Sequence, residues 1–142
     1  MQRGNEMEDQ ARASFEIESG LSVTTVGLAT NDAFPGMGAS LDGVVGNPAG
    51  SKVGIEIKCP LASTLVEYHH KGRLPSAYTE QIAAQMMICE LSTVHFWAWH
   101  PDCPPFHLVI AADHFDLEKL AEAARAFVAE LEEYADKLPG RI

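Results

Sequence analysis

The sequence predicts an α/β domain in which helices flank a mixed central β-sheet. The expected elements run helix, three strands, two helices, two strands and a final helix along 142 residues. A composition of 46% hydrophobic and 21% charged residues is that of a globular chain. The alternating, β-branched run Val53–Lys58 follows a turn rich in Gly, Pro, Asn and Ser, which is typical of the second strand of a hairpin. We therefore expect one domain with a single sizeable core.

The first half of the chain supplies a helix, a strand and this hairpin. A helix is expected over residues 5–18, because apolar side chains recur at i, i+4 spacing and Gly20 follows as a stop. Residues 21–30 are β-branched and polar by turns, and this alternation predicts the first strand. The hairpin occupies residues 38–60, and Pro60 ends it because proline cannot extend the ladder of hydrogen bonds.

The second half is expected to alternate helices and strands. In order, these elements are a helix at 61–70 capped by Ser63, a helix from 75 or 76 to 89, strands at 93–100 and 106–112, and a helix at 116–137. The strand at 93–100 is the most β-prone run, with Trp97 and Trp99 on one face. Its apolar content exceeds what one small sheet face needs, so it predicts a wall of the core or an interface between copies of the chain.

Three residues of the hairpin carry the candidate chemistry. Val53, Ile55 and Ile57 define an apolar strand face, so Glu56 and Lys58 share the other face, near Asp42 on the paired strand. An isolated Glu-x-Lys is usually a solvated face, and Asp-Gly can simply begin a turn. Together, two carboxylates and an ammonium suit a divalent-metal site for phosphodiester hydrolysis.

This Asp…Glu-x-Lys arrangement resembles the signature of the PD-(D/E)XK nuclease superfamily. Further segments resemble the phage lambda exonuclease, YqaJ-type viral recombinase family: SLDGVVG, GIEIKCP, AYTEQIAAQMMIC and FWAWHPD, with GNEMEDQARASFEIESG similar to the helix before the family's first core strand. These segments span nearly the whole chain in the family's order. The resemblance implies a restriction-endonuclease-like sandwich with a central mixed sheet flanked by helices.

The resemblance also implies a two-metal site. Asp42 would bridge two Mg²⁺ ions, for which Mn²⁺ can substitute, and Glu56 with the Ile57 carbonyl would complete one of them. Glu8, on the first helix, matches a family glutamate that faces the metal and would support the second ion. Lys58 would position the attacking hydroxide. Two ions stabilise the attacking and leaving oxygens of an in-line displacement.

Other residues are candidates for contact with DNA. By itself the Tyr-x-x-Gln pair on the helix after residue 75 is a polar stripe, but in the family it lies over the active site. The catalytic candidate on this helix is Gln81, and the candidate DNA contacts are Tyr78, Gln85, Lys71, Arg73 and Ser40. Glutamine is not a base at neutral pH, so Gln81 would hydrogen-bond a phosphate oxygen or a water.

The implied function is a metal-dependent exonuclease acting 5′ to 3′ on linear DNA in recombination, of phage or prophage type. The implied partners are duplex ends, further copies of the chain in a ring of three, and a single-strand annealing protein, in the cytoplasm of a bacterial host. Two alternatives stay open. One is a structure-specific or non-processive endonuclease on the same fold, and the other is a catalytically weak DNA-binding module.

Charge and segment composition bear on these alternatives. The formal net charge of −10 is unfavourable for DNA binding, which comes from Lys and Arg neutralising phosphates. Relatives carry a further N-terminal segment that helps to hold the 5′-phosphate, so residues 1–142 are expected to form a single nuclease domain without it.

Three cysteines without C-x-x-C spacing suggest neither a zinc ribbon nor a disulfide framework. No run is apolar enough to span a membrane, and no signal-peptide pattern is present.

Overall fold

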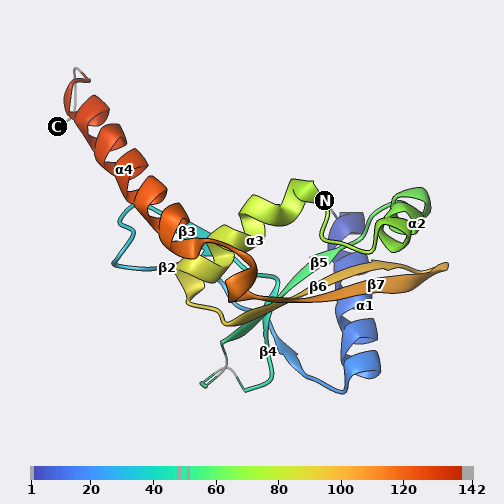
Figure 1. The fold of residues 1–142 in the computed structure, drawn as a ribbon. Helices are drawn as coiled ribbons and strands as arrows, with labels where there is room; N and C mark the ends of the chain where they lie inside the picture. Colours follow the sequence, from blue (N-terminus) through green and yellow to red (C-terminus); the bar gives the residue numbers. More distant parts are fainter. Residues whose placement is uncertain (1, 48, 51, 139–142) are drawn as a thin grey trace.

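A mixed five-stranded β-sheet forms the centre of the structure (Figure 1). The computed structural model describes residues 2–47, 49–50 and 52–138. The strands lie in the order β1 (Val23–Thr24), β4 (Gly43–Val45), β5 (Val53–Lys58), β6 (Thr93–His100) and β7 (Cys103–Ala111). β5 and β6 pair in parallel, and the other neighbours pair antiparallel. This arrangement confirms the predicted mixed sheet and the hairpin of β4 and β5.

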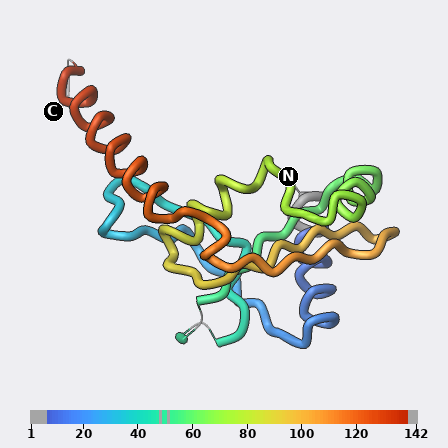
Figure 2. Tube along the Cα trace, in the orientation of Figure 1, coloured from blue at the N-terminus to red at the C-terminus, as the bar shows by residue number. Residues whose placement is uncertain are grey.

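Helices cover both faces of the sheet. α1 (Gln2–Ser19) packs on one face, where Ala11 and Phe15 contact Ile55, Ile57 and Trp97. α2 (Ala62–Lys71) and α3 (Ser76–Cys89) lie in the connection between β5 and β6 and cover the other face. Figure 2 shows the chain following this path. The core on that face contains Leu65, Ile82, Met86, Val94, Phe96 and Ala98.

Because both faces are covered, the polar face predicted for β5 is not a solvent-facing one. Glu56 is paired in register with Phe96 and lies on the side of α3, where its side chain is 2% exposed. Burial of a carboxylate is unfavourable unless it is paired and hydrogen-bonded. The partners of Glu56 therefore define the site.

Three sequence-based boundaries are wrong, each for a tertiary reason. The strand predicted at 21–30 is divided, since β1 joins the main sheet beside β4 while β2 (Leu28–Thr30) pairs with β3 (Gly38–Ser40) in a separate two-stranded sheet. β7 begins three residues before the predicted start and includes two prolines, which an edge strand tolerates because one side of its backbone is unpaired. Leu61, not Ser63, is the N-cap of α2 and makes no side-chain capping bond.

The residues of β6 are mostly internal. Phe96, Trp97 and Ala98 are each at most 2% exposed, and the Phe15 ring meets Trp97 edge-on at 5.4 Å between centroids. β6 lies between β5 and β7, so its apolar content serves the two cores of this one domain. The core therefore accounts for Phe96, Trp97 and Ala98, these residues give no separate argument for an oligomer, and the oligomeric state stays a prediction.

The final helix, α4 (Leu117–Asp136), follows a short 3₁₀ turn, η1 (Ala112–His114), and then projects from the body of the domain (Figures 1 and 2). Its first half packs through Leu120, Ala121 and Ala124 on the end of α3. Phe127, Leu131 and Tyr134, further along, are each more than half exposed. Within the described part of the chain, no helix has the length and apolar character needed to cross a membrane.

Candidate active site

The hairpin of β4 and β5 brings Asp42 and Glu56 to the same place. Gly43 pairs with Ile55, so the next step along the two strands sets Asp42 opposite Glu56. One carboxylate oxygen of Asp42, Oδ2, accepts a hydrogen bond of 2.7 Å from the backbone N–H of Ile57. This bond holds the Asp42 side chain against β5, beside the acidic strand residue that the sequence singled out.

Three donors surround the buried Glu56 carboxylate. Gln81 donates from Nε2 to Oε1 at 2.8 Å, and Gln85 donates from Nε2 to Oε2 at 2.7 Å. Lys58 forms an ion pair with Oε1, and its side chain is one-quarter exposed. The structure thus brings together Asp42, Glu56, Lys58 and Gln81, the four residues predicted from sequence as the centre of the chemistry.

The electrostatics of the site favour an added cation. Burial, and then the charge of Glu56 and, more weakly, of Glu8, raises the pKa of Asp42 from 3.8 to about 6, against the lowering effect of the Ile57 N–H bond. Burial by itself would lower the pKa of Lys58, but the hydrogen bond and charge of Glu56, with Asp42, outweigh it and raise that pKa. Lys58 therefore stays protonated at neutral pH.

Glu8 approaches this group from α1 and is only half-buried. Its carboxylate accepts a 3.0 Å hydrogen bond from Arg12, one turn further along the helix, and Arg12 also pairs with Asp9. The Glu8 charge contributes to the raised pKa of Asp42, so the two carboxylates face the same region. Arg12 was not anticipated from sequence, although its i, i+4 spacing from Glu8 is the signal for such a pair.

The sequence and the fold are similar to those of known proteins. Residues 1–92 match the family of the YqaJ-like viral recombinase domain. The chain belongs to this family. Two similar solved structures are of LHK-Exo, an alkaline exonuclease from Laribacter hongkongensis. The structure in complex with dAMP has 36% sequence identity and a TM-score of 0.82, covering 96% of this chain and 70% of that chain. The other has 33% identity and a TM-score of 0.77, covering 96% and 72%. A comparison with curated proteins found no match.

These likenesses confirm that this YqaJ-like chain has the PD-(D/E)XK fold, and nucleases of this family generally use divalent metal ions. The described residues contain no group of three or more His, Cys, Asp or Glu side chains that could hold a metal ion. The donor chemistry of the site nevertheless fits. A carboxylate offers about four lone-pair directions, and Glu56 uses three of them for Gln81, Gln85 and Lys58. Carboxylate oxygens are the hard ligands that Mg²⁺ takes, together with waters and substrate phosphates.

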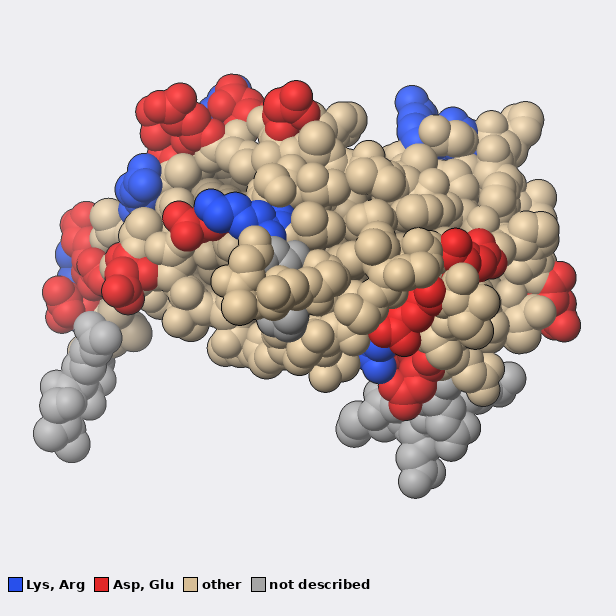
Figure 3. All heavy atoms as spheres, turned by 90° about the horizontal axis from the view of Figure 1, so that it is seen from below, with Lys and Arg blue, Asp and Glu red and all other residues tan. Residues whose placement is uncertain are grey.

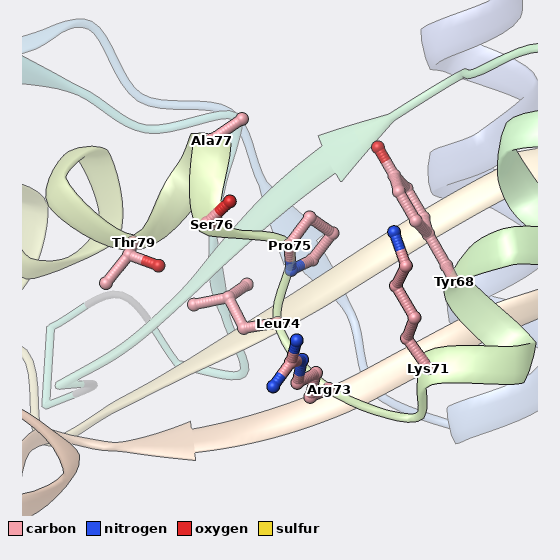
Figure 4. Close-up of a pocket in the computed structure, with 8 residues that line it drawn as sticks. All are labelled: Tyr68, Lys71, Arg73, Leu74, Pro75, Ser76, Ala77 and Thr79. Carbon is pink, nitrogen blue, oxygen red and sulfur yellow. The ribbon is translucent and has the colours of Figure 1, made fainter.

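The residues predicted to contact DNA fall into two groups. Gln85 is 2% exposed, and its amide is committed to Glu56 and to the carbonyl oxygen of Ser40, 2.9 Å away. In this position Gln85 orients Glu56 and does not lie on a surface that DNA could reach. Lys71 and Arg73 are exposed and line a hollow beside the end of α2 (Figure 4). Ser40 is exposed on β3.

Tyr78 connects this hollow with the site. Its ring lies 4.9 Å from Nζ of Lys58, a cation–π contact, and both Tyr78 and Tyr68 of α2 contact the ring of Phe96. Burial, followed by the proximity of Tyr78, raises the pKa of Tyr68 to about 12. Tyr68 had no sequence signal, because Tyr78 lies ten residues away on another helix.

The two glutamines are expected to differ in their effect on stability. Gln85→Met removes a buried donor to a carboxylate that no water replaces, so it should lower the free energy of unfolding by about 2 kcal/mol. Gln81 is exposed, so water can take the place of its amide, and Gln81→Met should cost less than about 1 kcal/mol. Urea unfolding of the metal-free variants measures the loss in free energy of unfolding for each substitution. Equal losses would contradict the view that burial makes Gln85 the structural partner of Glu56.

Proposed function

We propose that the chain is a metal-dependent exonuclease that hydrolyses phosphodiester bonds of linear DNA, in the 5′ to 3′ direction, during recombination. The observation that carries this proposal is the meeting of Asp42, Glu56 and Lys58 on one hairpin, with Gln81 donating to the same carboxylate. The similarity to LHK-Exo supports it, because that protein is an alkaline exonuclease and was solved with dAMP, a mononucleotide unit of DNA.

Mg²⁺, replaceable by Mn²⁺ and with two ions per site, would be held by Asp42, Glu56 and the Ile57 carbonyl, with Glu8 in support. Such ions activate water as a nucleophile and stabilise negative charge on the phosphate. Burial, and then the charge of Glu56, raises the pKa of Asp42, and a cation would relieve both unfavourable effects on its ionised form.

Lys58 and Gln81 complete the chemistry from the protein side. Lys58 is protonated and is held between the Glu56 carboxylate and the Tyr78 ring, so its ammonium is a fixed donor beside the carboxylates. There it orients the attacking oxygen and stabilises charge that develops in the transition state. Gln81 is exposed and can share its amide between Glu56 and a phosphate oxygen of the substrate.

Incubation of the purified protein with linear and covalently closed circular duplex DNA tests this proposal. Linear DNA should be consumed from its ends in Mg²⁺, closed circles should persist, and EDTA should stop the reaction. Ca²⁺ should permit binding but little cleavage. Full activity in EDTA would contradict the assignment of the carboxylates to a metal site.

The same experiment decides between the alternatives. Rapid nicking or linearisation of closed circles would favour an endonuclease on this fold. Binding without cleavage of either substrate would favour a DNA-binding module, which the net charge of −10 does not exclude but makes weak. Further proposals concern the cellular setting. They are a homo-oligomer, most simply a trimer, a single-strand annealing partner, and action in the cytoplasm of a bacterial host of a phage or prophage.

A further inference from the structure

A hollow of about 490 Å³ lies between the end of α2 and the beginning of α3. We call it the α2–α3 hollow, and its lining residues are Tyr68, Lys71, Arg73, Leu74, Pro75, Ser76, Ala77 and Thr79. Figure 4 shows Lys71 and Tyr68 extending in the same direction from α2, Arg73 on the connecting segment, and the hydroxyls of Ser76 and Thr79 on α3. Two cationic groups and two hydroxyl donors thus line one concave surface.

The cations of the hollow are available to a ligand. Arg73 is exposed and has no carboxylate partner among the residues that the structure describes. Lys71 pairs with Glu67 at 3.7 Å, but both side chains are more than half exposed, and an exposed pair of this kind contributes little. The first turn of α3 contains no acidic residue that could compete for either cation.

This local positive charge contrasts with the rest of the molecule. The chain has 20 acidic and 10 basic residues, and the face shown in Figure 3 carries several acidic clusters and only small basic areas. Arg12, Lys58 and Lys137 are paired with carboxylates at 3.0 Å or less. Tyr68, which lines the hollow, adds no negative charge near neutral pH, and burial raises its pKa further, to about 12.

The hollow also adjoins the candidate active site. Tyr78 lies between Ala77 and Thr79 of the lining, its ring contacts Lys58, and Lys58 is paired with Glu56. Tyr78 and Lys58 therefore connect the lining of the hollow with the carboxylate of Glu56. A DNA strand places charged phosphates at regular short intervals, so a strand with one phosphate at the carboxylates has another one nearby.

We propose that the α2–α3 hollow binds a phosphate group of the DNA strand next to the one positioned for hydrolysis. Arg73 supplies a planar set of donors that suits phosphate, Lys71 supplies a mobile point charge, and Ser76 and Thr79 supply hydroxyl donors. This inference rests on the proposed function for the identity of the strand. The phosphate is either an internal diester or the terminal monoester of a 5′ end, and both have the chemistry that the hollow recognises.

The test compares the DNA affinities of two double variants under conditions in which no DNA is cleaved. Lys71→Gln/Arg73→Gln removes both cations of the hollow. Lys119→Gln/Lys137→Gln removes the same charge from α4, and Lys137 pairs with Glu133 four residues earlier as Lys71 pairs with Glu67. Binding to labelled duplexes with either a 5′-phosphate or a 5′-hydroxyl is measured in EDTA by fluorescence anisotropy, over a series of salt concentrations. The single variant Arg73→Gln, at an exposed position, repeats the test if the double variant is unstable.

The hollow variant should bind at least about ten-fold more weakly than the α4 variant, and the slope of log affinity against log salt should fall by about 1 to 2. A loss with both duplexes identifies an internal phosphate, and a loss confined to the 5′-phosphorylated duplex identifies the terminal one. Equal affinity and equal slope for the two variants would overturn the proposal. If the wild-type protein cleaves linear DNA in Mg²⁺ while the two variants bind DNA with equal affinity, only the proposal for the hollow is wrong. If the wild type binds through the hollow without cleaving, only the proposed function is wrong.

Discussion

Asp42→Asn is expected to abolish DNA cleavage and, in the same protein, to raise the stability of the metal-free fold. Asparagine keeps an oxygen that can accept the Ile57 N–H bond but carries no charge to hold a divalent cation. The stabilisation follows from the pKa of Asp42, which is about 6 in the folded protein and 3.8 as the ordinary value. The folded state therefore binds this proton more tightly than the unfolded state does.

The sign of the pH dependence follows from that difference. Above about pH 6 the carboxylate is ionised in both states, and its ionised form in the fold opposes folding. Below about pH 4 it is protonated in both, so the penalty disappears. A shift of this size corresponds to at most about 3 kcal/mol, and solvent screening of a half-buried group reduces it to about 1 to 2 kcal/mol. The gain of Asp42→Asn should thus be complete at pH 7 and absent near pH 4.

Thermal unfolding in EDTA between these pH values measures the gain in stability of Asp42→Asn. Cleavage of linear DNA in Mg²⁺ measures its loss of activity. Asp113→Asn, at an exposed position outside the site, is the matched control and should change neither quantity. Mg²⁺ should stabilise the wild type and leave Asp42→Asn unchanged. A variant that is less stable than the wild type at pH 7, or one that still cleaves DNA, would show that Asp42 is not the carboxylate that needs the cation.

Lys58→Ala should lower the cleavage rate by about 10²- to 10³-fold while DNA affinity falls much less. The ammonium has donors and no lone pair, so it cannot be a metal ligand. Its position between Glu56 and the Tyr78 ring makes it a preorganised donor, and removal of one such donor has effects of this size on turnover. An interaction made mainly in the transition state changes the rate of the chemical step more than binding.

Single-turnover cleavage and anisotropy in Ca²⁺ separate the two quantities. Lys52→Ala, an exposed lysine just before β5, is the control for loss of a positive charge near the hairpin. Because Lys58→Ala leaves the buried Glu56 with only its amide donors, circular dichroism must first show that the variant is folded. Cleavage at the wild-type rate would mean that Lys58 is a structural partner of Glu56 and that the Glu-x-Lys spacing is accidental.

Much of the fold could be predicted because its signals are local. The helical spacing of Ala11 and Phe15 predicted α1, and the alternation along Val53–Lys58 predicted β5. The division between β1 and β2 and the start of β7 could not be read in this way. Residues 21–30 have one continuous alternating pattern, yet two different sheets take up its two ends. The prolines before Phe106 are ordinary strand breakers, and they are accepted in β7 only because it lies at the edge of the sheet.

The sequence by itself determined that Asp42, Glu56 and Lys58 lie together. Glu56 and Lys58 share a strand face because side chains alternate with a period of two, and the register of the hairpin sets Asp42 opposite Glu56. Only the tertiary structure decided how these groups behave. The packing of α3 on β5 buries Glu56 and supplies the amides of Gln81 and Gln85, which come from residues 25 and 29 positions away in the chain. The pKa of Asp42 and the contact of Tyr78 with Lys58 depend on the same packing, since burial and charge are properties of the surroundings in space.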